Sequence, residues 1–454
     1  MVLGTFLLPL AQSIFSAGSA NAAEAANSDT ESTPVFTKTY RSTIEIIWTC
    51  FTIIFASTWI CIHPNVPGYK TTPLQRAAIR GRLFIHALIF PEKLAMLAFR
   101  QWRGCHVLYR RFERRASGLG IPLRVEPSQE RAWTRAHAYF IQMGGIVFHK
   151  GEDTWFEDPS RWDDEDIKNF FKLKLTKRVV QDRSKADGLS KAFVIVECLW
   201  FLAQCIARGV RKISLTELEV TCLAFIACNF GMYCFWWNKP LDVICPIEIQ
   251  RPYRIRSKET EESRFQRRNP VLAFISAVVT TLDSGDFVRI INPTQTARGG
   301  HMTISSKEPS SSFPVYYYYR ENTGTQTLRV LYAEWGGPTL LAYIATPAVF
   351  GALHSIAWHG VFPSTAEMTI WRISCVVPAV YAVLFSSFNY VYSAPKKTPM
   401  ILFAIGVLGT LTVLVLPLNI AARFVFIVLP LLQLRDLPPQ AHQAISWANF
   451  LPHV

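Results

Sequence analysis

Residues 400–418 read MILFAIGVLGTLTVLVLPL, a stretch without a single charged side chain. A helix of about 20 apolar residues crosses the roughly 30 Å hydrocarbon core of a bilayer, so this stretch predicts a transmembrane helix. The run Phe424–Leu434 is shorter and could extend into a seventh span. Comparable apolar stretches occur earlier in the chain, at 44–62, 192–207, 215–237, 340–358 and 373–391. The sequence therefore predicts an all-α, polytopic transmembrane helical bundle with six or seven spans.

The charge of the chain fits the same class of protein. The formal net charge is +14, which could indicate a nucleic-acid partner, but no basic and aromatic module of a nucleic-acid-binding type is present. Polytopic membrane proteins collect Lys and Arg in their cytoplasmic loops and near anionic headgroups. We therefore expect the lipid bilayer, and no nucleic acid, as partner.

The amino terminus resembles an export signal. An apolar stretch, Phe6–Phe15, is followed by an A-x-A pattern at Ala20-Asn21-Ala22, which predicts a cleaved signal peptide over 1–22. An uncleaved anchor is the alternative. Residues 23–40 are rich in Ala, Asn, Ser and Thr and are expected to form a disordered linker. The prediction is a multi-pass protein of the endoplasmic reticulum or another secretory-pathway membrane.

Two membrane regions follow, at 41–283 and 339–454, separated by a variable polar loop or small β-rich excursion at 284–338. In the first region, the apolar islands 83–99 and 136–148 are too broken or too short to span, and they predict interfacial or re-entrant helices. S-x-x-E patterns at Ser42/Glu45 and Ser214/Glu217 predict helix starts.

The predicted export of the amino terminus orients the bundle, in accord with the positive-inside rule. It places segments 63–191 and 238–338 in the cytoplasm, together with Lys396-Lys397. The short loop that carries Arg208, Arg211 and Lys212 would then lie on the opposite side, against the rule.

Glu197 is the first catalytic candidate, because it lies in the middle of a predicted span. An ionisable group there is expensive and is by default a functional candidate. A protonated carboxyl in an apolar pocket could serve as an acid or base. Trp200 and Gln204 share its helix face and are candidate substrate contacts. The alternative is a neutral Glu197 that hydrogen-bonds a neighbouring helix.

His137 and Asp242 are further catalytic candidates, expected to line one opening at the level of the headgroups. His354 and Trp358, one turn apart in a span, are candidate substrate-binding residues. The structural alternatives are a packed interfacial helix for His137, a solvated helix end for Asp242, and a buried imidazole bonded to a backbone carbonyl for His354.

Metal and cofactor signals are weak. The carboxylates of Asp163–Asp166 could hold Mg²⁺, but they follow Ser160 at a predicted helix start, and no second acidic cluster completes a site. The ten cysteines show no zinc-ligand spacing. Nucleotide-binding and redox fingerprints are absent from the sequence. We expect neither a metal nor a cofactor.

Several sequence strings together resemble a large family of fungal integral-membrane proteins of largely unknown function. These strings are HPNVPG, WTRAHAYFIQMGG, DRSKADGLSKA, QCIAR, ELEVTCLAF, WWNKPLDV and SWANFLPHV. The resemblance implies a fungal membrane protein, and some family members take part in secondary-metabolite pathways.

Our functional expectation combines the resemblance with the missing cofactor motifs. It is a membrane-embedded, cofactor-free cyclase or isomerase that acts on a lipophilic small molecule in fungal secondary-metabolite biosynthesis, including pericyclic or Diels–Alder-type closure. Such reactions need mainly a shaped apolar pocket and a few polar groups. The alternative is a transporter or a non-catalytic accessory membrane protein for such a metabolite.

Overall fold

The computed structural model describes residues 40–67, 71–125, 130–150, 153–157, 159, 162–182, 188–250, 301–304, 338–392, 394 and 398–445. Residues Arg41–Ile445 belong to one compact unit, which is described here. The predicted signal peptide, most of the linker 23–40 and most of the variable loop 284–338 lie outside the described residues.

Six helices in the described part of the chain are long and apolar enough to cross a membrane. They are α2 (Thr43–Cys61), α8 (Gly188–Val210), α9 (Glu217–Phe235), α14 (Pro338–His354), α15 (Thr365–Tyr392) and α16 (Pro399–Gln433). The prediction of a polytopic helical bundle is confirmed. The run Phe424–Leu434 belongs almost wholly to α16, so it continues the sixth span rather than starting a seventh.

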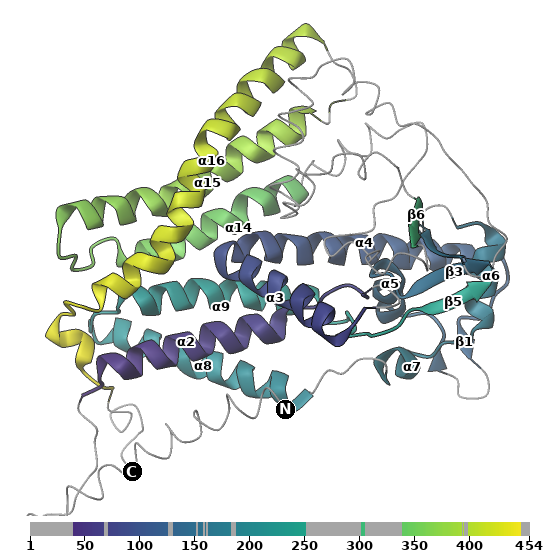
Figure 1. The fold of residues 1–454 in the computed structure, drawn as a ribbon, viewed down its shortest axis with the longest axis horizontal. Helices are drawn as coiled ribbons and strands as arrows, with labels where there is room; N and C mark the ends of the chain where they lie inside the picture. Colours follow the sequence, from purple (N-terminus) through teal and green to yellow (C-terminus); the bar gives the residue numbers. More distant parts are fainter. Residues whose placement is uncertain are drawn as a thin grey trace, which may run out of the picture. The chain divides into compact units, whose positions relative to one another are not determined.

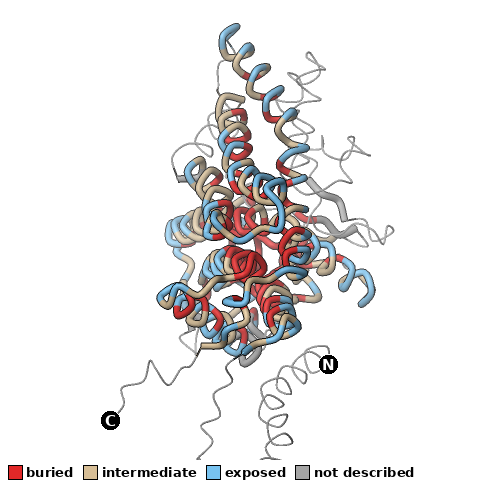
Figure 2. Tube along the Cα trace, turned by 90° about the vertical axis from the view of Figure 1, so that its left-hand side faces the viewer, coloured by how far each residue is buried: buried red, intermediate tan, exposed pale blue. Residues whose placement is uncertain are grey.

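The surface of this bundle is apolar, as a lipid environment requires. Figure 2 shows buried positions concentrated at the centre of the bundle, with exposed and intermediate positions around them. On α16, large side chains such as Phe403 and Leu414 are mostly exposed. A helix with this pattern is stable only where its outer face meets lipid or protein.

Capping explains where two of the spans begin. Ser42 Oγ accepts a hydrogen bond from the Glu45 backbone, and the Glu45 carboxylate accepts one from the Ser42 backbone, as the sequence predicts. At α9 the capping box is formed by Thr216 and Glu219 rather than by Ser214 and Glu217, so the prediction is two residues too early. Thr216 and Glu219 have the same spacing as Ser214 and Glu217. A search for the capping-box pattern therefore cannot distinguish the two pairs.

A helical hairpin enters the bundle between the spans. It consists of α3 (Pro73–Ile89) and α4 (Pro91–Gly118), joined at Phe90. The apolar island 83–99 therefore divides between the end of one helix and the start of the next. The first half of α4 packs against α9 and α14, and the second half runs out towards a small sheet (Figure 1). The tip of this hairpin is buried against the last span. Its interfacial or re-entrant placement in the membrane stays a prediction.

The sheet has the strand order β5-β3-β4-β6. Its strands are β3 (Ile146–Lys150), β4 (Asp153–Glu157), β5 (Ile247–Gln250) and β6 (His301–Ile304). The parallel pairing of β3 with β5 joins the described parts of the segments 63–191 and 238–338, which therefore lie on one side of the bundle. Two-residue strands β1 (Arg124–Val125) and β2 (Glu130–Arg131) pair separately.

The apolar island 136–148 is only partly helical. Helix α5 (Arg135–Gln142) ends before Gly144, which has φ 87°, and β3 follows. A Cβ at Gly145 would lie 2.6 Å from the carbonyl oxygen of Phe140, so only glycine fits this turn. The turn sends the chain into the sheet. The aromatic core beneath it includes Trp133 and Phe170, the latter on α6 (Asp164–Lys172).

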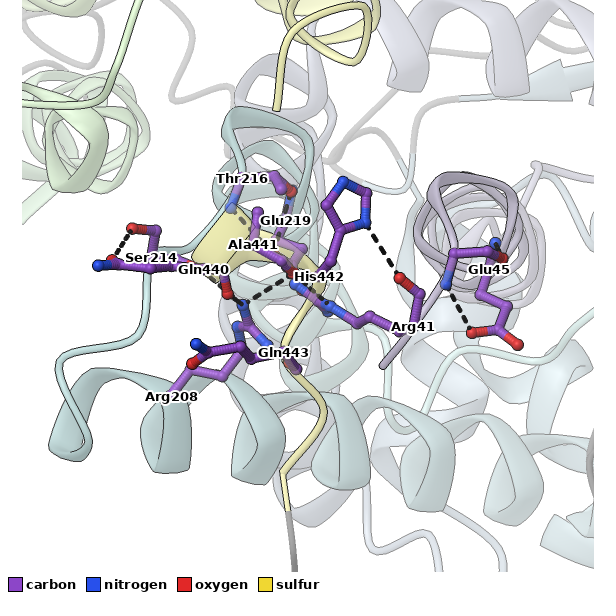
Figure 3. A network of polar contacts seen from close by, with 11 residues as sticks. Arg41, Glu45, Arg208, Ser214, Thr216, Glu219, Gln440, Ala441, His442 and Gln443 are labelled. Atoms are coloured by element: carbon purple, nitrogen blue, oxygen red, sulfur yellow. Dashed lines mark hydrogen bonds and ion pairs between the residues drawn. The ribbon is translucent and has the colours of Figure 1, made fainter. Parts of the chain in front are cut away.

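A network of hydrogen bonds around Arg41 and Arg208, called the clasp, joins the two ends of the described chain (Figure 3). The final described segment, which contains the short helix η6 (Pro439–His442), lies against the first residue of the unit. The Arg41 backbone donates to His442 O at 2.8 Å, and the Arg41 side chain donates to Ala441 O and to Glu219. Arg208 donates to the carbonyls of Ser214, Gln440, Ala441 and Gln443. Arg208 is therefore a buried internal donor, which accounts for its position against the positive-inside rule.

Candidate functional site

A charged pair is buried among the membrane-spanning helices. Arg423 Nη2 lies 2.8 Å from Glu92 Oε1, and each side chain is 2% exposed. Moving charges out of water is costly even when they are paired, and replacing a buried pair by apolar side chains is often neutral or stabilising. Ionisable groups within a membrane bundle usually mark functional sites. This pair is therefore the starting point for the site.

Glu92 comes from the hairpin and Arg423 from the last span. Glu92 follows Pro91 in the first turn of α4, where the helix dipole and free backbone N–H groups favour a carboxylate. Arg423 lies in α16 between Pro417 and Pro430. Its guanidinium stacks over the ring of Phe350 at 5.0 Å, a cation–π contact that partly replaces hydration.

His354 completes the group at the end of α14. Its side chain is fully buried, and Nδ1 lies 2.8 Å from the carbonyl oxygen of Phe350. A carbonyl can only accept, so Nδ1 carries the proton and Nε2 of the neutral ring is an acceptor. The ring lies 4.6 Å from the Phe350 ring and 3.8 Å from that of Phe426. Since Phe350 contacts both His354 and Arg423, the three polar residues Glu92, Arg423 and His354 form one buried cluster.

Four polar atoms of the buried cluster have no hydrogen-bond partner among the described residues. They are Glu92 Oε2, Arg423 Nε, Arg423 Nη1 and His354 Nε2. Buried polar atoms are nearly always hydrogen-bonded, and exceptions often mark functional positions. Glu92 Oε2 can act as a base, Arg423 Nε and Nη1 are cationic donors, and His354 Nε2 is a further acceptor. A reaction that transfers a proton while negative charge develops on an oxygen requires this set of groups.

Aromatic side chains and close helix packing hold the cluster in place. Trp371 Nε1 donates to the backbone oxygen of His354 at 3.2 Å, which ties α15 to the end of α14. A Cβ at Gly351 would collide with the carbonyl of Cys375, so glycine allows these two helices to approach closely. The surrounding side chains are apolar, and electrostatic interactions are stronger there than in water.

The candidate site residues named from the sequence do not lie together in the structure. Glu197 and Gln204 are half-buried and Trp200 is 49% exposed, all on α8, which packs mainly on α2. His354 is the one candidate that belongs to the buried cluster. Trp358, one turn further on, stacks with Arg372 at 5.4 Å. Whether α8 takes part in chemistry stays a prediction.

His137 is fully buried in the extramembrane part of the protein. Thr134 N–H donates to its Nδ1 at 3.1 Å, and its Nε2 donates to the backbone oxygen of Leu175 at 3.1 Å. Burial lowers the pKa of His137 to about 4, so the ring is neutral near pH 7. Both ring nitrogens are thus engaged in contacts that fix α5.

Asp242 has a different set of contacts. It is paired with Arg80, whose guanidinium also donates to Trp59 O at 3.0 Å. The described contacts of Asp242 and His137 share no residue, and the structure does not join them in one polar network. The polar run Asp182–Asp187, which precedes most of α8 in the sequence, lies mostly outside the described residues.

The acidic run Asp163–Asp166 is used for helix capping. Asp163 and Asp166 form a capping box at the start of α6, and Asp164 pairs with Arg115. These contacts show that the run begins a helix, as the sequence predicts.

Sequence reasoning missed Glu92 and Arg423. The sequence Pro91-Glu92-Lys93 interrupts the apolar island 83–99, and Arg423 falls between the apolar runs 400–418 and 424–434, so neither residue stands out as a candidate. Joining those runs into one long helix would have exposed Arg423 as a lone intramembrane charge.

A second polar group, around Lys239, ties the hairpin to the ends of the spans. Lys239 Nζ donates to His63 O at 2.6 Å, Asn65 Oδ1 at 2.9 Å and Gln101 Oε1 at 2.9 Å. Burial lowers the pKa of Lys239 well below its usual range, and the three acceptors offset that cost. Because all three N–H groups are engaged, Lys239 is a cross-link rather than a nucleophile.

Comparison with known proteins gives a single finding about the family. The model of a family of unknown function, DUF8562, matches residues 11–254. The match includes Glu92 and ends before His354 and Arg423. No curated protein and no solved structure matches the chain.

Proposed function

The chain belongs to this family of unknown function, and we propose that it is a membrane-embedded catalyst of proton transfer on a lipophilic small molecule, of the isomerase or cyclase type. The observation that carries the proposal is the buried Glu92–Arg423 pair, whose Oε2, Nε and Nη1 atoms have no partner among the described residues. A pair that served stability alone would more often have its remaining polar atoms satisfied.

The proposed reaction begins with Glu92 as base. Glu92 Oε2 takes a proton from an acidic C–H or O–H of the substrate: that bond breaks, an O–H bond forms on Glu92, and the electron pair moves onto a substrate oxygen. Arg423 donates hydrogen bonds from Nε and Nη1 to this oxygen as its negative charge develops. Return of the proton to another substrate atom completes an isomerisation or triggers ring closure.

Charge balance favours Glu92 over His354 as the base. When Glu92 accepts the proton, Arg423 exchanges one anionic partner for another, and the number of charges in the site stays constant. Protonation of His354 would instead create a second cation within electrostatic range of Arg423. We therefore assign His354 Nε2 the task of accepting a hydrogen bond from the substrate and orienting it.

The setting of the reaction follows from the sequence resemblance. It supports a role in fungal secondary-metabolite biosynthesis, in the endoplasmic reticulum or another secretory-pathway membrane. A lipophilic substrate would concentrate in the bilayer and reach the bundle from there, while the rigid aromatic surround would limit its conformations.

Transport of the same kind of molecule is the second candidate. The observation in its favour is the combination of a helical hairpin with prolines inside α14, α15 and α16. Interrupted helices near the midplane are common at transporter binding sites. A proton-coupled carrier would use the same Glu92, so the two candidates differ in product rather than in site.

Metabolite profiling of a deletion strain tests the proposal. Complementation with wild type is compared with Glu92→Gln, which keeps the shape but removes the base. We expect product to fall by about 10²-fold or more, with accumulation of a precursor, at normal protein levels in the membrane. Glu367→Gln is the matched control, since Glu367, in the first turn of α15, also pairs with an arginine, Arg435 at 2.5 Å. It should keep wild-type product.

Three outcomes decide between the candidates. Unchanged product in Glu92→Gln contradicts the proposal. Normal total product that fails to leave the cells supports transport instead. Loss of product in Glu197→Gln with full activity in Glu92→Gln would move the catalytic centre to α8.

A further inference from the structure

The buried cluster also defines the chemical class of its ligand, an inference that rests on the proposed function. The cluster holds one carboxylate and one guanidinium, already paired at 2.8 Å, beside a histidine whose Nδ1 is committed to Phe350 O. The pair is neutral as a whole. A ligand that added a net charge would leave that charge uncompensated in an apolar part of the bundle, at high cost.

The remaining hydrogen-bonding atoms set a second requirement. Glu92 Oε2 and His354 Nε2 are acceptors, and Arg423 Nε and Nη1 are donors; none of the four has a partner within the described residues. A ligand must therefore offer a donor and an acceptor close together. A ketone or ether lacks the donor, a quaternary ammonium lacks the acceptor, and a carboxylate or sulfonate lacks the donor and adds a second negative charge.

The aromatic side chains around His354 set a third requirement for the ligand. The rings of Phe350, Phe426 and Trp371 pack around His354, with centroid distances of 4.6, 3.8 and 5.7 Å. Aromatic faces of this kind favour a flat or conjugated apolar body.

From these three requirements we infer that the cluster binds an uncharged oxygen acid, such as a phenol or enol, at the end of a flat apolar body. Its acidic O–H donates to Glu92 Oε2 and its oxygen accepts from Arg423, while a second O–H or N–H of the natural ligand donates to His354 Nε2. The same arrangement places the acidic proton beside the base, so recognition and proton transfer use one set of atoms.

Binding in lipid nanodiscs tests the inference with three probes of equal chain length. 4-Octylphenol has the donor, 4-octylanisole has the same shape without it, and 4-octylbenzenesulfonate is a permanent anion. We expect wild type to bind the phenol about 10-fold or more tightly than the anisole, since a buried charged acceptor loses its partner with the ether. The sulfonate should bind weakly.

The Glu92→Gln variant should reverse this selectivity. It leaves Arg423 without an anionic partner in the pair, so the sulfonate should bind at least about 10-fold more tightly than to wild type. The double variant Glu92→Leu/Arg423→Met measures simple partitioning into the nanodisc and should not discriminate among the probes. Glu367→Gln should behave as wild type.

Two results separate this inference from the proposed function. Equal binding of phenol and anisole to wild type overturns the ligand class, even if Glu92→Gln abolishes product formation. A clear preference for the phenol together with undiminished product in Glu92→Gln keeps the ligand class and overturns the catalytic role.

Discussion

Glu92 and Arg423 lie in distant parts of the sequence, yet their side chains meet at 2.8 Å inside the bundle. The contact joins the first turn of α4, at the tip of the hairpin, to the C-terminal half of the last span. Without the hairpin, α16 would carry a lone arginine among apolar helices. Without Arg423, the tip of the hairpin would bury an unpaired carboxylate. Each element therefore lowers the energetic cost of the charge that the other buries.

The clasp yields a prediction about chain truncation. Arg208 holds the backbone of Gln440, Ala441 and Gln443, and Cys205, which is 4% exposed, lies one turn away. Ending the chain after Leu437 removes these acceptors and should loosen α8. We expect the rate of maleimide labelling at Cys205 to rise about 10-fold or more, because labelling follows local opening. Ending the chain after Ile445 keeps the clasp and should leave Cys205 protected; equal labelling of the two truncations would show that the clasp does not hold α8.

His137 predicts how stability depends on pH. Burial lowers its pKa from 6.5 to about 4, so between these values only the unfolded chain binds the proton. Stability of the extramembrane part is therefore complete above about pH 6.5 and is lost as the pH falls towards 4, by on the order of 3 kcal/mol at most.

His137→Gln isolates this effect. Glutamine at the third position of a helix that starts with Thr134 preserves a capping box but does not titrate. We expect the acid sensitivity of denaturant unfolding to be smaller in His137→Gln than in wild type. Identical pH profiles of the two proteins would mean that His137 titrates normally in the folded state.

The sheet predicts the orientation of the loops. Since β3 pairs with β5, the described parts of both long polar segments share one side, and from their Lys and Arg content we predict that this side faces the cytoplasm. Cys245 is exposed just before β5 and should react with an impermeant maleimide in sealed, cytoplasmic-side-out vesicles. Cys245→Ser identifies the labelled site, and a cysteine placed at Gln440 should react only after permeabilisation. The reverse pattern would invert the topology.

The spans could be predicted from the sequence because the hydropathy of a spanning helix is summed over about 18 residues. A single polar residue or proline changes that sum little. The sequence pattern also interpreted Asp163–Asp166 correctly as a helix start. For His354 the structure shows the alternative named from sequence, an imidazole bonded to a backbone carbonyl, and a part in substrate binding stays a prediction. The sheet was missed within 136–148, because a short apolar run fits a strand as well as a helix. Its partner strands lie far away in the sequence, at Ile247–Gln250 and His301–Ile304.

The same limit explains the buried cluster. Glu92 follows a proline and Arg423 lies between two apolar runs, so each has a plausible local explanation as the end of a helix. Only their pairing across the fold shows that both are buried. His354 was found because it interrupts a span, but its role depends on Phe350 O fixing the tautomer and on Arg423 from another helix.

The proposed function requires that the Glu92–Arg423 pair serves chemistry rather than folding. The most direct measurement is product formation by Glu92→Leu/Arg423→Met in the deletion strain, beside the control pair Glu367→Leu/Arg435→Met. Removing both buried charges together avoids an unpaired ion, so the variant should fold, with thermal unfolding in nanodiscs close to wild type. The account predicts a folded, membrane-inserted protein without product, whereas the control keeps its activity. Wild-type product from the Glu92→Leu/Arg423→Met protein would contradict it.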